Sequence, residues 1–121
     1  MTPDEKIQEL NLILPEPIKL PPNIEMQFSW VRISGNRVFI SGHIALNADG
    51  SVSEVTGKVG GEVTVEQGYE AARQTGLAIL SSLKRELGTL NKITAWLRVF
   101  GMVNVEPGFV KTPLVLSLIH I

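Results

Sequence analysis

The sequence predicts an α+β domain in which one long helix covers one face of a sheet. Between residues 64 and 88, apolar and small side chains recur at the three- and four-residue spacing of one helix face. Residues 28–33 and 37–44 before it, and 93–104 after it, have the alternating or continuous apolar patterns of strands. A helix of this length needs a flat apolar partner, and the strands supply one.

Both ends of the long helix are marked by residue type. Thr64 suits the N-cap, and Gln67 follows at the spacing of a capping box, in which side chain and backbone satisfy each other's free hydrogen-bonding groups. Gly88 can adopt the left-handed conformation that commonly ends a helix. The helix is therefore predicted to run from Thr64 to Gly88.

The composition is that of one globular domain, which we expect to span residues 1–121. Apolar residues make up 44% and charged residues 19% of the chain. The net charge of -1, with acids and bases interspersed, gives no electrostatic basis for binding a nucleic acid or an acidic membrane. The absence of cysteine excludes disulfides and thiolate chemistry. With a polar, acidic N-terminus and no long apolar run, this predicts a cytoplasmic location.

The N-terminal part is predicted to be a short helix followed by a strap. Thr2, Pro3 and Glu5 have the types and spacing of a capped helix start. The four prolines in residues 14–23 exclude a helix interior or a central strand, so this segment should run extended across the surface. Residues 1–23 thus form a helix and a proline-rich strap within the same domain.

The first two strands should form a hairpin, because Ser34, Gly35 and Asn36 between them suit a tight turn. The polar, glycine-rich residues 45–62 predict a loop. The strand at 93–104 would then return parallel to the hairpin through a right-handed crossover. Its apolar side chains face both sides, so the second sheet face needs another helix, another subunit or both, and self-association is the simplest solution.

Few residues suggest chemistry. Ser41 and His43 lie two apart on the predicted strand and could be a nucleophile and its base, but no third orienting residue is evident, so we favour two ordinary polar residues. His43 and His120 are far apart, and no carboxylate cluster accompanies them, which argues against a metal site. Arg98 lies among apolar residues, which favours a structural ion pair over a ligand contact.

The C-terminal end is unusual. Residues 107–110 suit the entrance to a second helix, yet only a dozen residues follow them. A sheet covered by one helix buries little surface for a chain of this length. We therefore expect a chain that is cut short, with part of residues 116–121 foreign to its natural continuation.

The order of short motifs resembles the Rid family, also called YjgF-like or endoribonuclease L-PSP proteins, and in particular its longer subgroup with a leading helix. The motifs are LPEP at 14–17, GNRVFISGHI at 35–44, TGKVG at 56–60, TVEQGYEAAR at 64–73 and GMVNVEPGF at 101–109. The resemblance covers about residues 14–113. It implies a chorismate-mutase-like sheet packed on one face by helices and assembled as a homotrimeric barrel, with ligand clefts between subunits.

The resemblance also implies a function. Deaminating members hydrolyse reactive enamines and 2-imino acids to 2-oxo acids and ammonia without a metal or organic cofactor, and so act on small carboxylate-bearing metabolites. The matching substrate-binding positions are Ser41, Gly42 and His43, with histidine in place of the usual glutamine, and Phe28 near the place of an aromatic hydroxyl. The family's carboxylate-binding arginine and late acidic residue lie on C-terminal strands beyond Ile121, so no catalytic residue is assigned.

Two other functions stay open. One is a non-catalytic trimer that binds a small metabolite or regulates a partner, which the absence of the distal arginine would favour. The other is the endoribonuclease or translation-inhibitor role of some relatives, which the nearly neutral charge disfavours.

Overall fold

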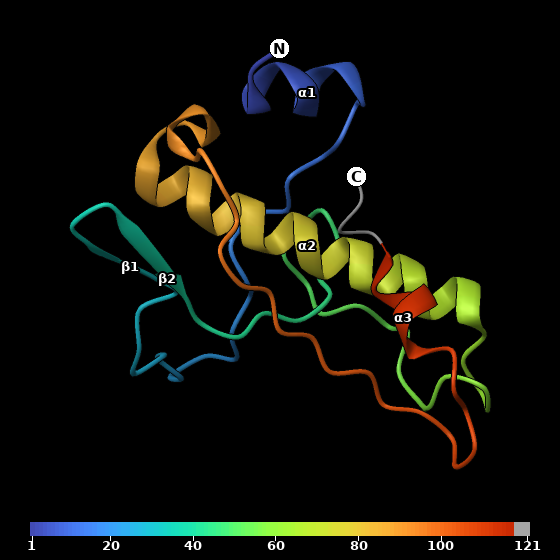
Figure 1. Ribbon diagram of the computed structural model, residues 1–121. Coiled ribbons are helices and arrows are strands. Elements are labelled where there is room, and N and C mark those ends of the chain that lie inside the picture. The colour runs from blue at the N-terminus through green and yellow to red at the C-terminus, as the bar shows by residue number, and fades with distance from the viewer. Residues whose placement is uncertain (118–121) are drawn as a thin grey trace.

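The computed structural model describes residues 1–117 and is organised along one long helix (Figure 1). The hairpin lies beside the C-terminal part of this helix, and the last short helix lies against its N-terminal half. No helix within residues 1–117 is long and apolar enough to cross a membrane. The elements in order are α1 (Pro3–Glu9), β1 (Val31–Ser34), β2 (Arg37–Ile40), α2 (Val65–Leu87), the 3-10 helix η1 (Leu90–Lys92) and α3 (Thr112–Val115).

Helix α2 begins and ends where the sequence predicts. The backbone N–H of Gln67 donates to Thr64 Oγ1 at 3.1 Å, and the Thr64 N–H donates to Gln67 Oε1 at 2.9 Å, which completes the capping box. At the other end Gly88 has φ +81°, and its N–H donates to the carbonyl of Lys84 at 2.8 Å. The predicted helix and both of its end signals are confirmed.

The predicted hairpin is present, with shorter strands than expected. β1 and β2 pair antiparallel from Val31 opposite Ile40 to Ser34 opposite Arg37, around a two-residue turn in which Gly35 has φ +61°. Residues 28–30 precede β1, and 41–44 follow β2. The expectation that Ser41 and His43 lie on a strand is therefore wrong, because the opposing strand supplies partners only as far as Ile40, apart from one bond from Ser41 N–H to the Trp30 carbonyl.

The helix packs on the hairpin, as its apolar face requires. Leu83 and Val31 are buried together with Leu90, and Val38 and Ile40 pack against them from the hairpin. A second cluster of Val59, Val63 and Val115 joins the loop and α3 to the first turns of α2. The main core thus lies between one side of the hairpin and the C-terminal half of α2.

The predicted strand at 93–104 is wrong for this structure, and the parallel crossover is wrong with it. The sheet within residues 1–117 has two strands, and this segment forms no regular structure. The β-type pairing nearest to it is an isolated bridge between Val59 and Val105. Apolar alternation marks a segment that can be buried as a strand, but a strand also needs a ladder of hydrogen bonds to a neighbour. Within residues 1–117 no such ladder forms along this segment, and the bond from the Val59 N–H to the Asn104 carbonyl lies at its very end.

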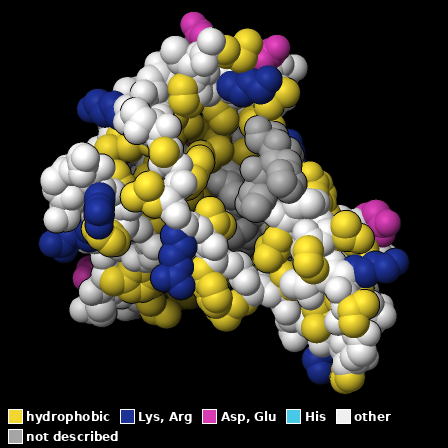
Figure 2. All heavy atoms as spheres, viewed as in Figure 1, with side chains coloured by type: hydrophobic (Ala, Val, Ile, Leu, Met, Phe, Trp, Pro, Cys, Tyr) yellow, Lys and Arg dark blue, Asp and Glu magenta, His cyan; other side chains and the backbone are white. Residues whose placement is uncertain are grey.

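Large apolar side chains of this segment are exposed instead. Leu97 is 79%, Phe100 75% and Met102 85% exposed. Figure 1 shows the segment as an orange trace that leaves η1 and runs to the loop before α3. In Figure 2 apolar side chains occupy much of the visible surface. Arg98 is exposed as well, and the favoured structural ion pair is not formed within residues 1–117.

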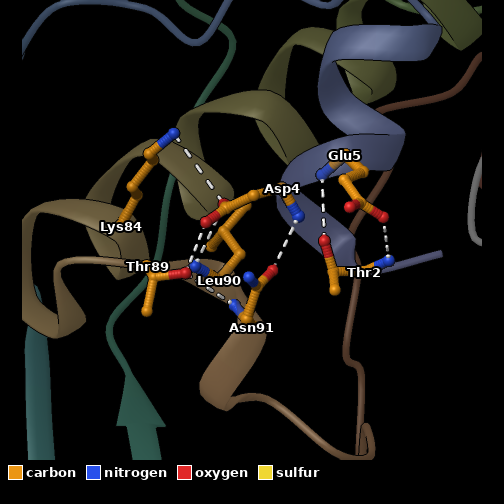
Figure 3. A network of polar contacts seen from close by, with 7 residues as sticks. All are labelled: Thr2, Asp4, Glu5, Lys84, Thr89, Leu90 and Asn91. Atoms are coloured by element: carbon orange, nitrogen blue, oxygen red, sulfur yellow. Dashed lines mark hydrogen bonds and ion pairs between the residues drawn. The ribbon is translucent and has the colours of Figure 1, made fainter.

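Helix α1 has the predicted capping box, formed by Thr2 and Glu5, and it docks on the turn after α2 (Figure 3). The Asp4 carboxylate accepts hydrogen bonds from the Thr89 hydroxyl and, at 3.2 Å, from the Leu90 N–H, while Asn91 Oδ1 accepts from the Asp4 N–H at 2.9 Å. These bonds connect the N-terminal helix to the turn after α2, because Asp4 satisfies backbone and hydroxyl donors at the start of η1.

The proline-rich strap at 14–23 contains no helix or strand, as predicted. Its backbone is held by the N–H groups of Glu16 and Lys19, which donate to the carbonyls of Ala48 and Gly50 at 3.0 Å each. Pro15 is buried, and its carbonyl accepts a hydrogen bond from the Ser81 hydroxyl at 2.6 Å. The strap therefore connects the loop at 45–62 with helix α2.

Between residues 107 and 117 the chain forms one short helix, α3, which begins later than the predicted entrance at 107–110. Leu116 and Ser117 follow it. We expected part of residues 116–121 to be foreign to the natural chain, but residues 118–121 lie outside the described part of the chain. The second histidine, His120, lies there too.

Candidate functional site

The four predicted site residues lie around one tryptophan. Ser41, Gly42 and His43 form the loop directly after β2, and Phe28 lies just before β1. The ring centroid of Trp30 is 5.0 Å from that of Phe28 and 5.0 Å from that of His43. Phe28, before β1, and the 41–43 loop, after β2, therefore lie at the same end of the hairpin, and Trp30 contacts both.

The His43 imidazole is held at both ring nitrogens. Nδ1 lies 2.7 Å from the carbonyl oxygen of Ser41, which can only accept, so we assign the proton to Nδ1. Nε2 lies 2.8 Å from the Ser82 hydroxyl, which then donates to it. This arrangement fixes one tautomer and ties the loop to helix α2.

Arg85 completes the chain of hydrogen bonds. Its Nη2 donates to the Ser82 hydroxyl at 3.2 Å, so Ser82 accepts from Arg85 and donates to His43. Loss of hydration in the half-buried position lowers the pKa of His43 below 6.5; the Ser41 carbonyl opposes this shift, and the Arg85 charge adds to it. We call this chain, Arg85 to Ser82 to His43 to the Ser41 carbonyl, the Arg85 relay. Because loss of hydration outweighs the Ser41 contact, the half-buried position favours a neutral imidazole.

Ser41 and His43 do not form a nucleophile and base. The Ser41 hydroxyl donates to the carbonyl of Ser29 at 2.7 Å, and His43 contacts the carbonyl of Ser41 rather than its hydroxyl. Activation of a hydroxyl requires the base at that hydroxyl. The interpretation of two ordinary polar residues is confirmed in this respect.

The loop still offers groups to a ligand. Gly42 is exposed, and a Cβ added to it would meet nothing within 4 Å. Phe28 is also exposed. The peptide groups at Gly42 and the ring of Phe28 are therefore open, whereas the nitrogens of His43 are already used. Within residues 1–117 no group of three or more His, Cys, Asp or Glu side chains could hold a metal ion.

A hollow lies next to this loop, between the start of the hairpin and the last turns of α2. Its volume is about 520 Å³. None of the four predicted site residues lines it. The lining residues are Ser29, Trp30, Val31, Arg32, Ser82, Arg85 and Glu86. We call it the Arg85 pocket.

Comparison with known proteins identifies the family. No protein-family model matches the chain. Protein TCP17 of Trypanosoma cruzi is 31% identical over 94 residues, 76% of this chain, and the chain spans 58% of the length of that curated relative. The structure of "a putative endoribonuclease" of Shewanella oneidensis MR-1 is similar at a TM-score of 0.81 and 28% identity, over 97% of this chain and 74% of that one. The chain belongs to the Rid, or YjgF-like, family.

A second solved structure supports the Rid family. Protein Atu1372 of Agrobacterium tumefaciens, whose function is unknown, matches 93% of this chain and 66% of its own at 32% identity and a TM-score of 0.73. The mixed α+β fold predicted from the sequence is therefore that of a Rid protein. The short motifs from the strap to Phe109 carry this kinship in the sequence.

Sequence reasoning missed the groups that hold the Rid-type loop in place. None of these groups was among the predicted site residues: they are Trp30, Ser82 and Arg85. One signal was available: Ser81 and Ser82 are adjacent hydroxyls at buried positions of α2, where a buried hydroxyl needs a partner. The partners, Pro15 and His43, could not be read from the helix pattern.

Proposed function

We propose that this protein binds a small carboxylate-bearing metabolite at the 41–43 loop and acts as a Rid-type deaminase of 2-imino or enamine acids. The observation that carries the proposal is the arrangement of that loop, in which the Arg85 relay fixes His43 while the backbone at Gly42 stays open. Kinship with the Rid family supports the same assignment of the loop. A pre-organised loop lowers the entropy lost when a ligand binds.

The proposed reaction needs no covalent nucleophile. Water adds to the carbon of the C=N bond, the nitrogen takes up protons, and the C–N bond breaks to give a 2-oxo acid and ammonia. The protein must hold the substrate carboxylate and position the water. In this arrangement His43 is a positioning residue, because Ser82 occupies its accepting nitrogen. The carboxylate-binding arginine would come from the family's later strands.

The proposed site lies at the seam of a homotrimer. The exposed side chains of Trp96, Leu97 and Phe100 support assembly, since contiguous exposed apolar surface marks interaction sites. A neighbouring subunit would cover these side chains. Sedimentation equilibrium measures this, and we expect a particle of three chains.

The activity is tested with freshly generated 2-iminopropanoate, whose disappearance is followed against the buffer rate. We expect acceleration by the protein and its loss in Gly42→Val, because a branched side chain would cover the open backbone. His43→Gln is the matched control, since glutamine can also donate to a carbonyl and accept from a hydroxyl. Decay at the buffer rate would remove the deaminase assignment and leave a non-catalytic metabolite-binding trimer.

A further inference from the structure

The Arg85 pocket contains an exposed cation that is held by hydrogen bonds and has no ion-pair partner within residues 1–117. Arg85 Nη1 donates to the Ser81 hydroxyl at 2.6 Å and to the Pro15 carbonyl at 3.5 Å, and Nη2 donates to the Ser82 hydroxyl at 3.2 Å. All three acceptors are neutral. Within residues 1–117 no carboxylate forms an ion pair with Arg85. The protein has therefore oriented the guanidinium without neutralising it.

The free donors of Arg85 match a carboxylate. A guanidinium has five N–H groups, and the recorded bonds leave Nε–H and one N–H of Nη2 without a partner in residues 1–117. Neighbouring parallel donors of this kind bind the two oxygens of a carboxylate together. Because the side chain is already ordered by Ser81 and Ser82, a ligand would not have to order it.

The other walls restrict the ligand further. Trp30 and Val31 offer an aromatic and an aliphatic surface. Glu86 brings a negative charge, so the pocket disfavours ligands that carry more than one. Its volume of about 520 Å³ lies in the range of small-molecule sites.

We propose that the Arg85 pocket binds a small monoanion, a carboxylate on Arg85 with its flat apolar body against Trp30. This site is separate from the 41–43 loop and does not depend on the proposed deaminase activity. The two sites share Ser82, which lines the pocket and contacts His43.

Trp30 can report on the pocket directly. The chain has two tryptophans, so Trp96→Phe leaves Trp30 as the sole indole fluorophore. In this background the protein is titrated with benzoate, with acetate, which lacks the ring, and with benzamide, which lacks the charge. We expect a saturable change with benzoate and binding weaker by about tenfold or more for the other two, because each lacks one of the two contacts. Equal binding of benzamide and benzoate would overturn the proposal.

Substitutions of Arg85 test whether benzoate binds in the pocket. Arg85→Gln should weaken benzoate binding by about tenfold or more, and Arg85→Lys should fall between, because lysine keeps the charge without the paired donors. Arg37→Gln removes an arginine from the hairpin outside the pocket and should change nothing. An equal loss in Arg37→Gln would mean that only general charge matters and would contradict the proposal.

A second variant, which should strengthen binding, keeps the proposal testable if Arg85→Gln does not fold. The Glu86 side chain makes no recorded hydrogen bond or ion pair within residues 1–117, so Glu86→Gln should fold normally. It should bind benzoate a few-fold more tightly, since it removes a negative charge from the pocket. Glu66→Gln, at the far end of the same helix, is the matched control. No tightening in Glu86→Gln relative to Glu66→Gln would also overturn the proposal.

Discussion

Ser82 is the residue on which the geometry of the 41–43 loop depends most. It is buried, and its hydroxyl both accepts from Arg85 and donates to His43. His43 and Ser82 are 39 positions apart in the sequence, so this one hydroxyl connects helix α2 to the loop after the hairpin. Removal of a shared buried partner leaves both neighbours unsatisfied.

We predict that Ser82→Ala destabilises the protein by about 1 to 3 kcal/mol, because it leaves Nε2 of His43 without its donor in a half-buried position. Urea unfolding followed by circular dichroism measures the change. Ser34→Ala is the control, since Ser34 is exposed and makes no recorded side-chain hydrogen bond within residues 1–117. Equal effects of the two substitutions would show that the relay does not stabilise the fold.

The half-buried His43, which contacts Ser82, also predicts that the stability of the fold depends on pH. The pKa of His43 in the folded protein is below its unfolded value of 6.5, so below pH 6.5 the unfolded chain binds a proton that the folded protein does not yet bind. Stability is therefore highest above pH 6.5 and falls as the pH drops below it.

Urea midpoints measured between about pH 8 and pH 5 should fall in the wild type and stay flatter in His43→Gln. The carboxylates Asp4, Asp49 and Glu62, whose pKa values are also lowered, act only at more acidic pH. An unchanged slope in His43→Gln would contradict the assignment.

At the scale of elements, stability depends on how α2 ends and how α1 attaches. Gly88 ends α2 with φ +81°, a conformation that places a Cβ too close to the carbonyl oxygen in other residues. Asp4 attaches α1 to η1 through its side chain, and the half-buried Ile7 of α1 packs against the core beside it. Both features depend on a single residue, and each makes a separate prediction.

Gly88→Ala should destabilise the fold by about 1 to 2 kcal/mol, because a Cβ there meets nothing within 4 Å and only the backbone conformation is penalised. Gly88→Asn should lose less, since asparagine tolerates the left-handed conformation better. Thermal and urea unfolding measure both. Gly42→Ala, in open space without a positive φ, should be neutral, and a comparable loss there would contradict the argument.

Asp4→Asn should release α1 from the start of η1, because it removes the charge that accepts from Thr89, Leu90 and Lys84. Hydrogen exchange at the Leu90 amide measures this and should speed up. In the wild type the pKa of Asp4 lies below 3.8, mainly because of the Thr89 hydroxyl. The same release should therefore occur as the pH falls through that lowered value. Glu9→Gln, at the exposed end of α1, should leave the Leu90 amide protected.

At the scale of the whole molecule, one long apolar segment lacks cover within residues 1–117. Residues 93–104 have the side chains of a strand that is buried on both faces, yet within residues 1–117 they have no neighbouring strand. If a second copy covers them, as proposed, a polar substitution there should disrupt assembly and leave the fold of each chain unchanged.

Phe100→Ser should therefore lower the mass found by sedimentation equilibrium without changing the circular dichroism spectrum. The ring is 75% exposed in the single chain, so its removal should not disturb the core. Arg98→Ser, two residues away and also exposed, is the control. An unchanged mass in Phe100→Ser would mean that this segment does not lie in the interface.

The sequence by itself determined the parts of this protein whose partners lie within a few residues. Both capping boxes, the Gly88 end of α2 and the Gly35 turn are closed by groups at most four positions apart, so residue type and spacing were sufficient. Only the tertiary structure decided that 93–104 finds no strand to pair with within residues 1–117, and that Ser82 and Arg85 hold His43 in place. Strand pairing and buried polar contacts depend on segments far apart in the chain, and no local pattern encodes which of them meet.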